Sequence, residues 1–248
     1  FPFLSLEVWG RVLSIVASSF STLFVFILGR RFLGERGGLI SAFFFAFLPF
    51  NIYFSRVILP EPLSVAFALL SLVLFVRWFD TSTSSVQDAS VASAQAGSIY
   101  LFASGLSFSL AMLVKPYVIF YAIPMVWLVL KKFDFEFGKV FKSRELWAFA
   151  AIALIPVAIW RVWMFKFPEG IPFYKWVFNS DGIRFRPSFW RWIFGERVGR
   201  LILGGWGIFV FVGGLVAKGK KEENGFVLAF IISSFAYVAT IASANVRH

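Results

Sequence analysis

The sequence predicts an all-α fold, a polytopic bundle of transmembrane helices that forms one domain over residues 1–248. Of the 248 residues, 59% are hydrophobic and 15% are charged, whereas soluble domains average about 45–50% apolar and about 25% charged residues. Phe alone supplies 35 residues, and a soluble chain of this size would expose much of that surface to water. The apolar residues form charge-free runs without the strict alternation of a membrane β-barrel, so helices are the expected spanning elements.

About eight runs are candidate membrane helices. They cover residues 12–29, 39–54, 63–76, 99–114, 117–130, 146–160, 201–217 and 225–244. A spanning helix needs about 20 residues. The shorter runs therefore need flanking residues such as Arg77 and Trp78, whose long side chains can reach the headgroups.

The net charge of +11, from 24 basic and 13 acidic residues, would suggest nucleic acid binding in a soluble protein. Here the basic residues lie in the connections between apolar runs, which indicates membrane lipids and not nucleic acid as partners. Connections 30–38, 131–145 and 218–224 are rich in Lys and Arg, whereas 55–62 and 115–116 hold one basic residue each. Basic loops are typically cytoplasmic. We therefore expect a multi-pass protein of the cell membrane, either a plasma or an inner membrane, with residue 1 outside.

Two segments interrupt the apolar pattern. Residues 80–98 are rich in Ser, Ala and Thr and predict a cytoplasmic linker. Residues 161–200 are expected outside as a basic and aromatic loop, for which interfacial anchoring and substrate binding are both open. Because the chain begins at Phe1 and ends at His248 directly after an apolar run, we expect it to be an internal fragment.

Ionisable residues at the edges of apolar runs are the main candidates for chemistry. Glu61 lies in an outer turn between two prolines, where it either takes part in a site or only favours the positive N-terminal end of the next helix. Lys115 joins the runs 99–114 and 117–130 without an acid nearby in sequence. Either it binds a phosphate or its side chain marks the outer membrane boundary.

Other catalytic signals are missing from the sequence. The absence of Cys excludes disulfides, thiol nucleophiles and Cys-ligated metals. There is no G-x-G-x-x-G segment after a strand, no P-loop and no H-E-x-x-H. The single His, His248, stands at the chain end and cannot be judged from its neighbours. The sequence therefore gives no support for a nucleotide site or a zinc protease.

Several short motifs stand at the ends of the apolar runs. They are W-G-R-V-L-S at 9–14, L-G-R-R-F-L-G-E-R-G-G-L at 28–39, L-P at 48–49, S-R at 55–56, L-P-E-P-L at 59–63 and the Gly-to-Lys-Pro segment 105–116, with N-V-R-H at 245–248 as a further match at the chain end. Together they resemble the glycosyltransferases of the GT-C class that use polyprenyl- or dolichyl-phosphate sugars, mainly over about residues 9–130. The closest branch is the group of dolichyl-phosphate-mannose protein mannosyltransferases and aminoarabinose transferases.

The resemblance implies a GT-C-like membrane enzyme that moves a hexosyl or pentosyl group from a polyprenyl-phosphate donor to a hydroxyl of a protein or lipid acceptor. Transfer would take place on the extracytoplasmic face with inversion at the anomeric carbon. Glu61 matches an acidic position of the second outer loop, where it would orient the acceptor, assist the base or help to hold a divalent cation. Lys115 matches a Lys near the carrier phosphate, and Arg11 and Arg56 are further phosphate candidates.

The resemblance also places the principal acid in a first outer loop that would precede Phe1, so we expect the 248-residue chain to be inactive alone. A transporter or a flippase of lipid-linked glycans is the main alternative. Such proteins tend to show internal repeats and broken helices at mid-membrane, and neither is clear here. A membrane scaffold without catalysis is a third alternative, in which Glu61 and Lys115 would be freely replaceable.

Overall fold

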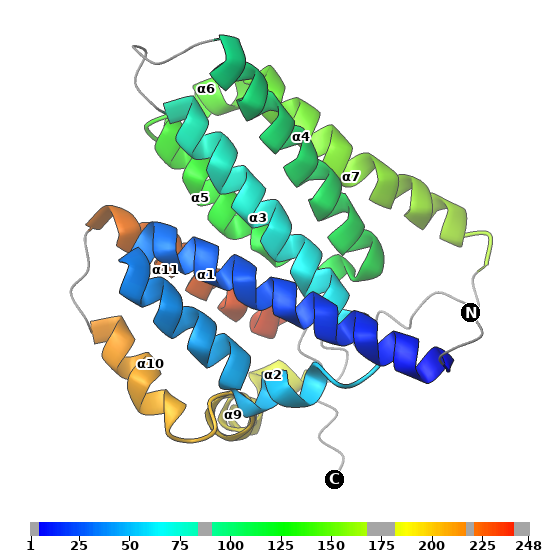
Figure 1. The fold of residues 1–248 in the computed structure, drawn as a ribbon, viewed down its shortest axis with the longest axis vertical. Coiled ribbons are helices and arrows are strands. Elements are labelled where there is room, and N and C mark those ends of the chain that lie inside the picture. Colours follow the sequence, from blue (N-terminus) through cyan, green and yellow to red (C-terminus); the bar gives the residue numbers. More distant parts are fainter. Residues whose placement is uncertain (1–4, 84–90, 168–181, 217–220, 241–248) are drawn as a thin grey trace.

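The computed structural model describes residues 5–83, 91–167, 182–216 and 221–240. Every regular element within these ranges is a helix, which confirms the predicted all-α fold, and the longer helices pack side by side in a bundle (Figure 1). The elements are α1 (Leu6–Phe47), α2 (Pro49–Phe54), α3 (Glu61–Thr83), α4 (Val91–Val114), the 3-10 helix η2 (Pro116–Tyr121), α5 (Ala122–Lys132), α6 (Phe137–Lys142), α7 (Arg144–Met164), η4 (Ile183–Phe185), α9 (Pro187–Arg191), the π-helix η5 (Trp192–Ile202), α10 (Gly207–Val216) and α11 (Lys221–Thr240).

α1 is a helical hairpin. At Gly34 the backbone has φ 76° and ψ 177°, a conformation that is almost confined to glycine, and the chain turns back on itself (Figure 1). The two arms touch at Gly29 and Gly38, where a Cβ on Gly38 would lie only 2.7 Å from the backbone nitrogen of Arg30. Small residues permit this close approach of helix backbones. The predicted run 12–29 and the larger part of the run 39–54 are therefore two arms of one element.

The second arm of α1 ends earlier than the sequence predicts. Leu48 is extended, with φ −62° and ψ 133°, as expected for a residue that precedes proline. Pro49 then begins the separate six-residue helix α2. A proline is well suited to the first position of a helix, because the backbone N–H group that it lacks would have no hydrogen-bond partner within the helix there.

α3 is the central helix of the bundle. Leu72 and Trp78 are almost completely buried, and α3 packs against α1 on one side and α4 on the other (Figure 1). Ser71 and Ser104 join α3 to α4, since each hydroxyl donates to the backbone carbonyl of the other residue at 2.8 Å. Small hydroxyl residues at such a contact let membrane helices pack closely and satisfy their own polar groups.

The count of about eight membrane spans is not confirmed. Among the described residues, four helices are long and apolar enough to cross a membrane, namely α1, α3, α7 and residues Gln95–Val114 of α4. The run 201–217 is divided between η5 and α10, because Gly204 (φ 62°) and Gly205 (φ 77°) are in the left-handed region and interrupt the helix. α10 has only ten residues, about half of the roughly 20 that a span needs.

The two segments predicted to be irregular are partly helical. α3 and α4 extend into both ends of the predicted linker 80–98, where the hydroxyl groups of Thr81 and Thr83 donate to backbone carbonyls one turn earlier at 2.8 Å. Residues 84–90 lie outside the described residues. Within the predicted loop 161–200, the described part contains the end of α7 and the elements η4, α9 and η5, while 168–181 lie outside it.

The two ends of the bundle carry different contacts. Beside the C-terminal part of α3, Arg31 forms a bidentate ion pair with Asp80 at 2.6 and 2.8 Å, and Lys132 lies 3.9 Å from the ring centroid of Trp78. The basic connections 30–38 and 131–145 therefore lie at this end. Glu61 begins α3 at the other end, about 35 Å away for a helix of 23 residues.

Candidate active site

Glu61 and Lys115 meet at the end of the bundle where α3 begins. Glu61 is the first residue of α3, and Lys115 is the extended residue between α4 and η2. The Nζ atom of Lys115 lies 2.9 Å from Oε1 of Glu61, and about a third of each side chain is exposed. The structure therefore brings together the two residues that the sequence singled out, although 53 positions of the chain separate them.

The helix N-terminus alone does not account for the surroundings of Glu61. Its position in the first turn of α3 does favour a negative charge. However, Oε2 of Glu61 is buried and has no hydrogen-bond partner in the described part of the chain. A buried acceptor without a partner is unusual in a folded protein. The hydrogen-bonding capacity of this oxygen is therefore unused in the described part of the chain.

Glu61 lines a cavity of about 870 Å³ between helices that are distant in sequence. The walls come from α1, α2, α3, η2, η5 and α11, and they combine aromatic rings with hydroxyl groups. Cavities of about 300–1,000 Å³ with a few polar groups among apolar walls are typical small-molecule sites. Lys115 is not part of the wall itself and reaches the cavity through its ion pair with Glu61.

Three tyrosines of this cavity had no role in the sequence interpretation: Tyr117, Tyr121 and Tyr237. Tyr237 lies on α11, 120 positions after Tyr117, and no local pattern connects the two. The available signal was their position, since Tyr117 begins one apolar run and Tyr237 stands in the second half of another. In the predicted topology these positions are near the same membrane face.

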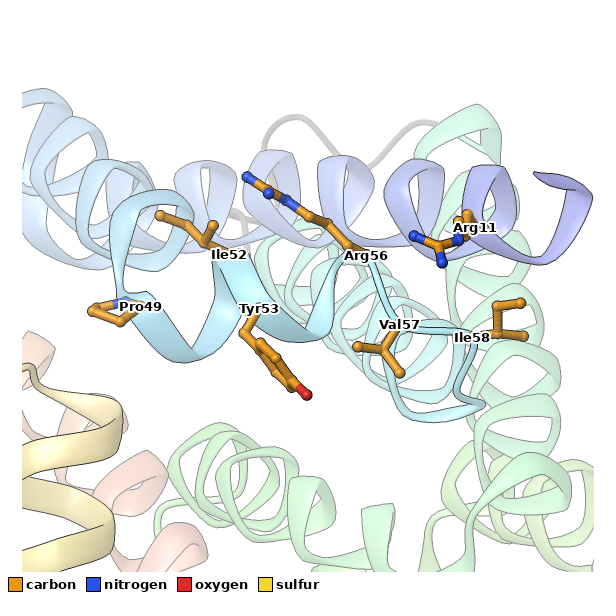
Figure 2. A pocket seen from close by; sticks show the side chains of 7 residues that line it. All are labelled: Arg11, Pro49, Ile52, Tyr53, Arg56, Val57 and Ile58. Atoms are coloured by element: carbon orange, nitrogen blue, oxygen red, sulfur yellow. The ribbon is translucent and has the colours of Figure 1, made fainter. Parts of the chain in front are cut away.

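Arg11 and Arg56 line a different cavity, of about 770 Å³. Figure 2 shows Arg11 on the first arm of α1 and Arg56 after α2, and the other side chains that line this pocket are Tyr53 and the apolar residues Pro49, Ile52, Val57 and Ile58. Arg11 also forms an exposed ion pair with Glu7, at 2.7 Å. The structure thus places the two arginines in one pocket, but neither Glu61 nor Lys115 lines it.

The described part of the predicted outer loop contributes apolar side chains to the main cavity. Phe194 and Val198 of η5 line it. Two basic residues of the same helix contact other residues of η5. The guanidinium of Arg197 lies 4.5 Å from the ring centroid of Trp192, and Arg200 forms an ion pair with Glu196 at 3.2 Å. A π-helix of 11 residues is unusual, since most π-helical segments are single turns within an α-helix.

The described residues around Glu61 do not by themselves make a divalent cation site. Among them, Glu61 is the one carboxylate of the cavity wall, and its Oε1 is paired with an ammonium group. The described residues contain no group of three or more His, Cys, Asp or Glu side chains that could hold a metal ion. Mg²⁺ and Ca²⁺ need several oxygen ligands, so a bound cation stays a prediction of the resemblance.

Comparison with protein families gives a match over most of the chain. The family described as dolichyl-phosphate-mannose-protein mannosyltransferase matches residues 2–175, a range that contains all four predicted site residues. Comparison with curated proteins and with solved structures gives no significant match. The match runs from α1 through α7 and thus extends beyond the motifs between residues 9 and 130. The chain belongs to the dolichyl-phosphate-mannose-protein mannosyltransferase family.

Proposed function

We propose that Glu61 and Lys115 form the centre of a site that transfers a sugar from a polyprenyl-phosphate donor to an acceptor hydroxyl on the extracytoplasmic face of the membrane. The family to which the chain belongs consists of membrane glycosyltransferases that use a dolichyl-phosphate sugar as donor. The observation that carries the residue assignment is the 2.9 Å ion pair beside a cavity of about 870 Å³. Mannose is the sugar that the family indicates, and a protein hydroxyl is the acceptor.

Lys115 is the proposed ligand of the donor phosphate. In the transfer, the bond between the anomeric carbon and the phosphate oxygen breaks, and its electron pair stays on the phosphate. A fixed ammonium group near that oxygen stabilises the negative charge that develops there. The ion pair with Glu61 supports this role, because it keeps the Lys115 ammonium near the cavity until a phosphate replaces the carboxylate.

Glu61 is the proposed ligand of the acceptor. Its Oε2 is buried beside the cavity without a hydrogen-bond partner in the described residues. A hydroxyl that donates to this oxygen has its own oxygen free to attack the anomeric carbon, and its proton leaves toward a carboxylate as the new bond forms. Attack from the side opposite to the phosphate gives the inversion that the resemblance implies.

The position of the site supports the extracytoplasmic face. Arg30, Arg36 and the basic connection 131–145 belong to the opposite end of the bundle, and basic loops are typically cytoplasmic. The match to a mannosyltransferase family favours transfer over the alternative of a transporter or flippase.

The test is sugar transfer by the whole protein in membranes, with Glu61→Gln and Lys115→Ala as variants. Dolichyl-phosphate mannose is the donor and a Ser/Thr peptide the acceptor. Each variant should lose at least 100-fold in kcat/KM, in line with the loss of one electrostatic contact to a transition state.

A matched pair of control variants is Glu136→Gln and Lys139→Ala, which break an exposed ion pair of 2.8 Å at the opposite end of the bundle. Both controls should keep transfer within twofold of the wild type. Normal turnover of Glu61→Gln and Lys115→Ala would exclude the site assignment. Loss of transfer in the control variants to the same extent would show that any broken ion pair disables the protein.

A further inference from the structure

We propose that Tyr117 and Tyr237 form the part of the site that binds the sugar ring and selects it by its hydroxyl groups. The inference rests on the proposed function, since it assigns the sugar of the donor to these two phenols. No sequence motif connects the two residues. Their juxtaposition on η2 and α11 is a property of the tertiary structure.

The two tyrosines adjoin the Glu61–Lys115 pair. The ring centroids of Tyr117 and Tyr237 are 5.3 Å apart with an interplanar angle of 51°, and the ammonium of Lys115 lies 5.9 Å from the Tyr117 centroid. Both phenols are also within electrostatic range of the Glu61 carboxylate. Both side chains line the cavity. A cation, a carboxylate and two phenols thus form one continuous group.

This combination matches the chemistry of a pyranose ring. A phenol both donates and accepts hydrogen bonds, and an ionised carboxylate accepts them. The hydroxyl groups of a sugar donate and accept in the same way, whereas the C–H face of the ring packs on an aromatic surface. The ammonium is placed for the phosphate to which the sugar is attached. A purely apolar ligand such as a prenyl chain would leave the buried Oε2 of Glu61 without a partner.

A hydrogen bond between helices fixes the position of Tyr237. Ser233, one turn before Tyr237 on α11, donates from Oγ to the backbone carbonyl of Phe120 at 2.6 Å. Phe120 follows Tyr117 by three residues, which is one turn of a 3-10 helix, and its ring lies 6.1 Å from that of Tyr237. Ser233 therefore acts as a positioning residue that holds α11 against η2.

The experiment uses Tyr117→Phe and Tyr237→Phe in the whole protein, since Phe keeps the ring and removes only the hydroxyl. Each variant should lower kcat/KM for dolichyl-phosphate mannose about tenfold, with unchanged thermal unfolding in detergent. Tyr100→Phe is the matched control, because Tyr100 packs against the hydrophobic core and does not line the cavity. This control should keep kcat/KM within twofold.

A set of deoxymannosyl donors makes the test specific for sugar recognition. The wild-type protein should discriminate against the donor that lacks a hydroxyl bound by a tyrosine, because the phenol is then left without its partner. The corresponding Phe variant should lose that discrimination at least fivefold.

The outcomes separate this inference from the proposed function. Unchanged kcat/KM and unchanged discrimination in both Phe variants, with Glu61→Gln and Lys115→Ala inactive, would overturn the sugar-binding role alone. Full activity of Glu61→Gln and Lys115→Ala would overturn the proposed function first. Equal losses for mannosyl and all deoxymannosyl donors would show a role in folding or phosphate binding and would also overturn sugar recognition by the tyrosines.

Discussion

Replacing Gly38 by alanine should destabilise the α1 hairpin. The added methyl group would lie 2.7 Å from the backbone nitrogen of Arg30 and 2.9 Å from the carbonyl oxygen of Phe26. Neither neighbour is a flexible side chain, so the two arms would have to separate along their contact. Overpacking of this kind typically destabilises a protein by about 1–3 kcal/mol.

The sign of this effect makes the prediction informative. Within a helix, alanine is intrinsically more favourable than glycine by about 1 kcal/mol, so helix propensity alone predicts that Gly38→Ala is stabilising. Gly138 of α6 is the matched control, because a Cβ there would meet no atom within 4 Å. We expect Gly138→Ala to be neutral or slightly stabilising and Gly38→Ala to be destabilising by at least 1 kcal/mol.

The assay is reversible unfolding of the purified protein in mixed detergent micelles, followed by circular dichroism. The free energy of unfolding of each variant is compared with that of the wild type in the same micelles. Equal or higher stability of Gly38→Ala relative to Gly138→Ala would refute the close packing of the two arms. A result of that kind would also mean that the turn at Gly34 does not bring the arms into contact.

Two further predictions concern contacts between helices. In a double-mutant cycle of Ser71→Ala and Ser104→Ala, measured by unfolding in micelles, the coupling free energy should be about 0.6 kcal/mol and at most about 1.7 kcal/mol. These are the values found for other hydrogen bonds between membrane helices. A coupling free energy of zero would contradict the two reciprocal hydrogen bonds. Lys132→Met should lower the free energy of unfolding by about 1–2 kcal/mol, because the ammonium lies 3.9 Å from the centroid of the buried Trp78. Lys139→Met is the control, because Lys139 forms an exposed ion pair, and it should change the free energy of unfolding by less than about 0.5 kcal/mol. Equal changes for Lys132→Met and Lys139→Met would exclude a cation–π contribution of Lys132.

The amino-acid sequence was sufficient to predict a helical membrane protein and to single out Glu61 and Lys115 as candidates for its chemistry. Apolar composition and charge-free runs reflect the solvent around the helices, and these properties are local in sequence. The same holds for Glu61 and Lys115, since a charged group at the edge of an apolar run is noticeable without knowledge of its neighbours. The family motifs were equally local, and the match over residues 2–175 confirmed the membership that they indicated.

The boundaries and number of the spans depended on backbone conformation. Hydropathy does not distinguish two separate helices from the two arms of α1, because the turn at Gly34 requires only one glycine with positive φ. The left-handed glycines Gly204 and Gly205 likewise divide a run that is continuous in hydropathy. Such turns are set by single φ and ψ values.

Which side chains share a cavity depends on how the helices pack. The sequence grouped Arg11 and Arg56 with Lys115 as phosphate ligands, whereas packing of α1 against α2 gives the two arginines a cavity of their own. Packing of α11 against η2 likewise brings Tyr237 beside Tyr117. These contacts join segments up to 120 positions apart. The reason is physical: a side chain reaches only a few ångströms, so its partners are set by how whole helices dock, and hydropathy carries no information about which helices become neighbours.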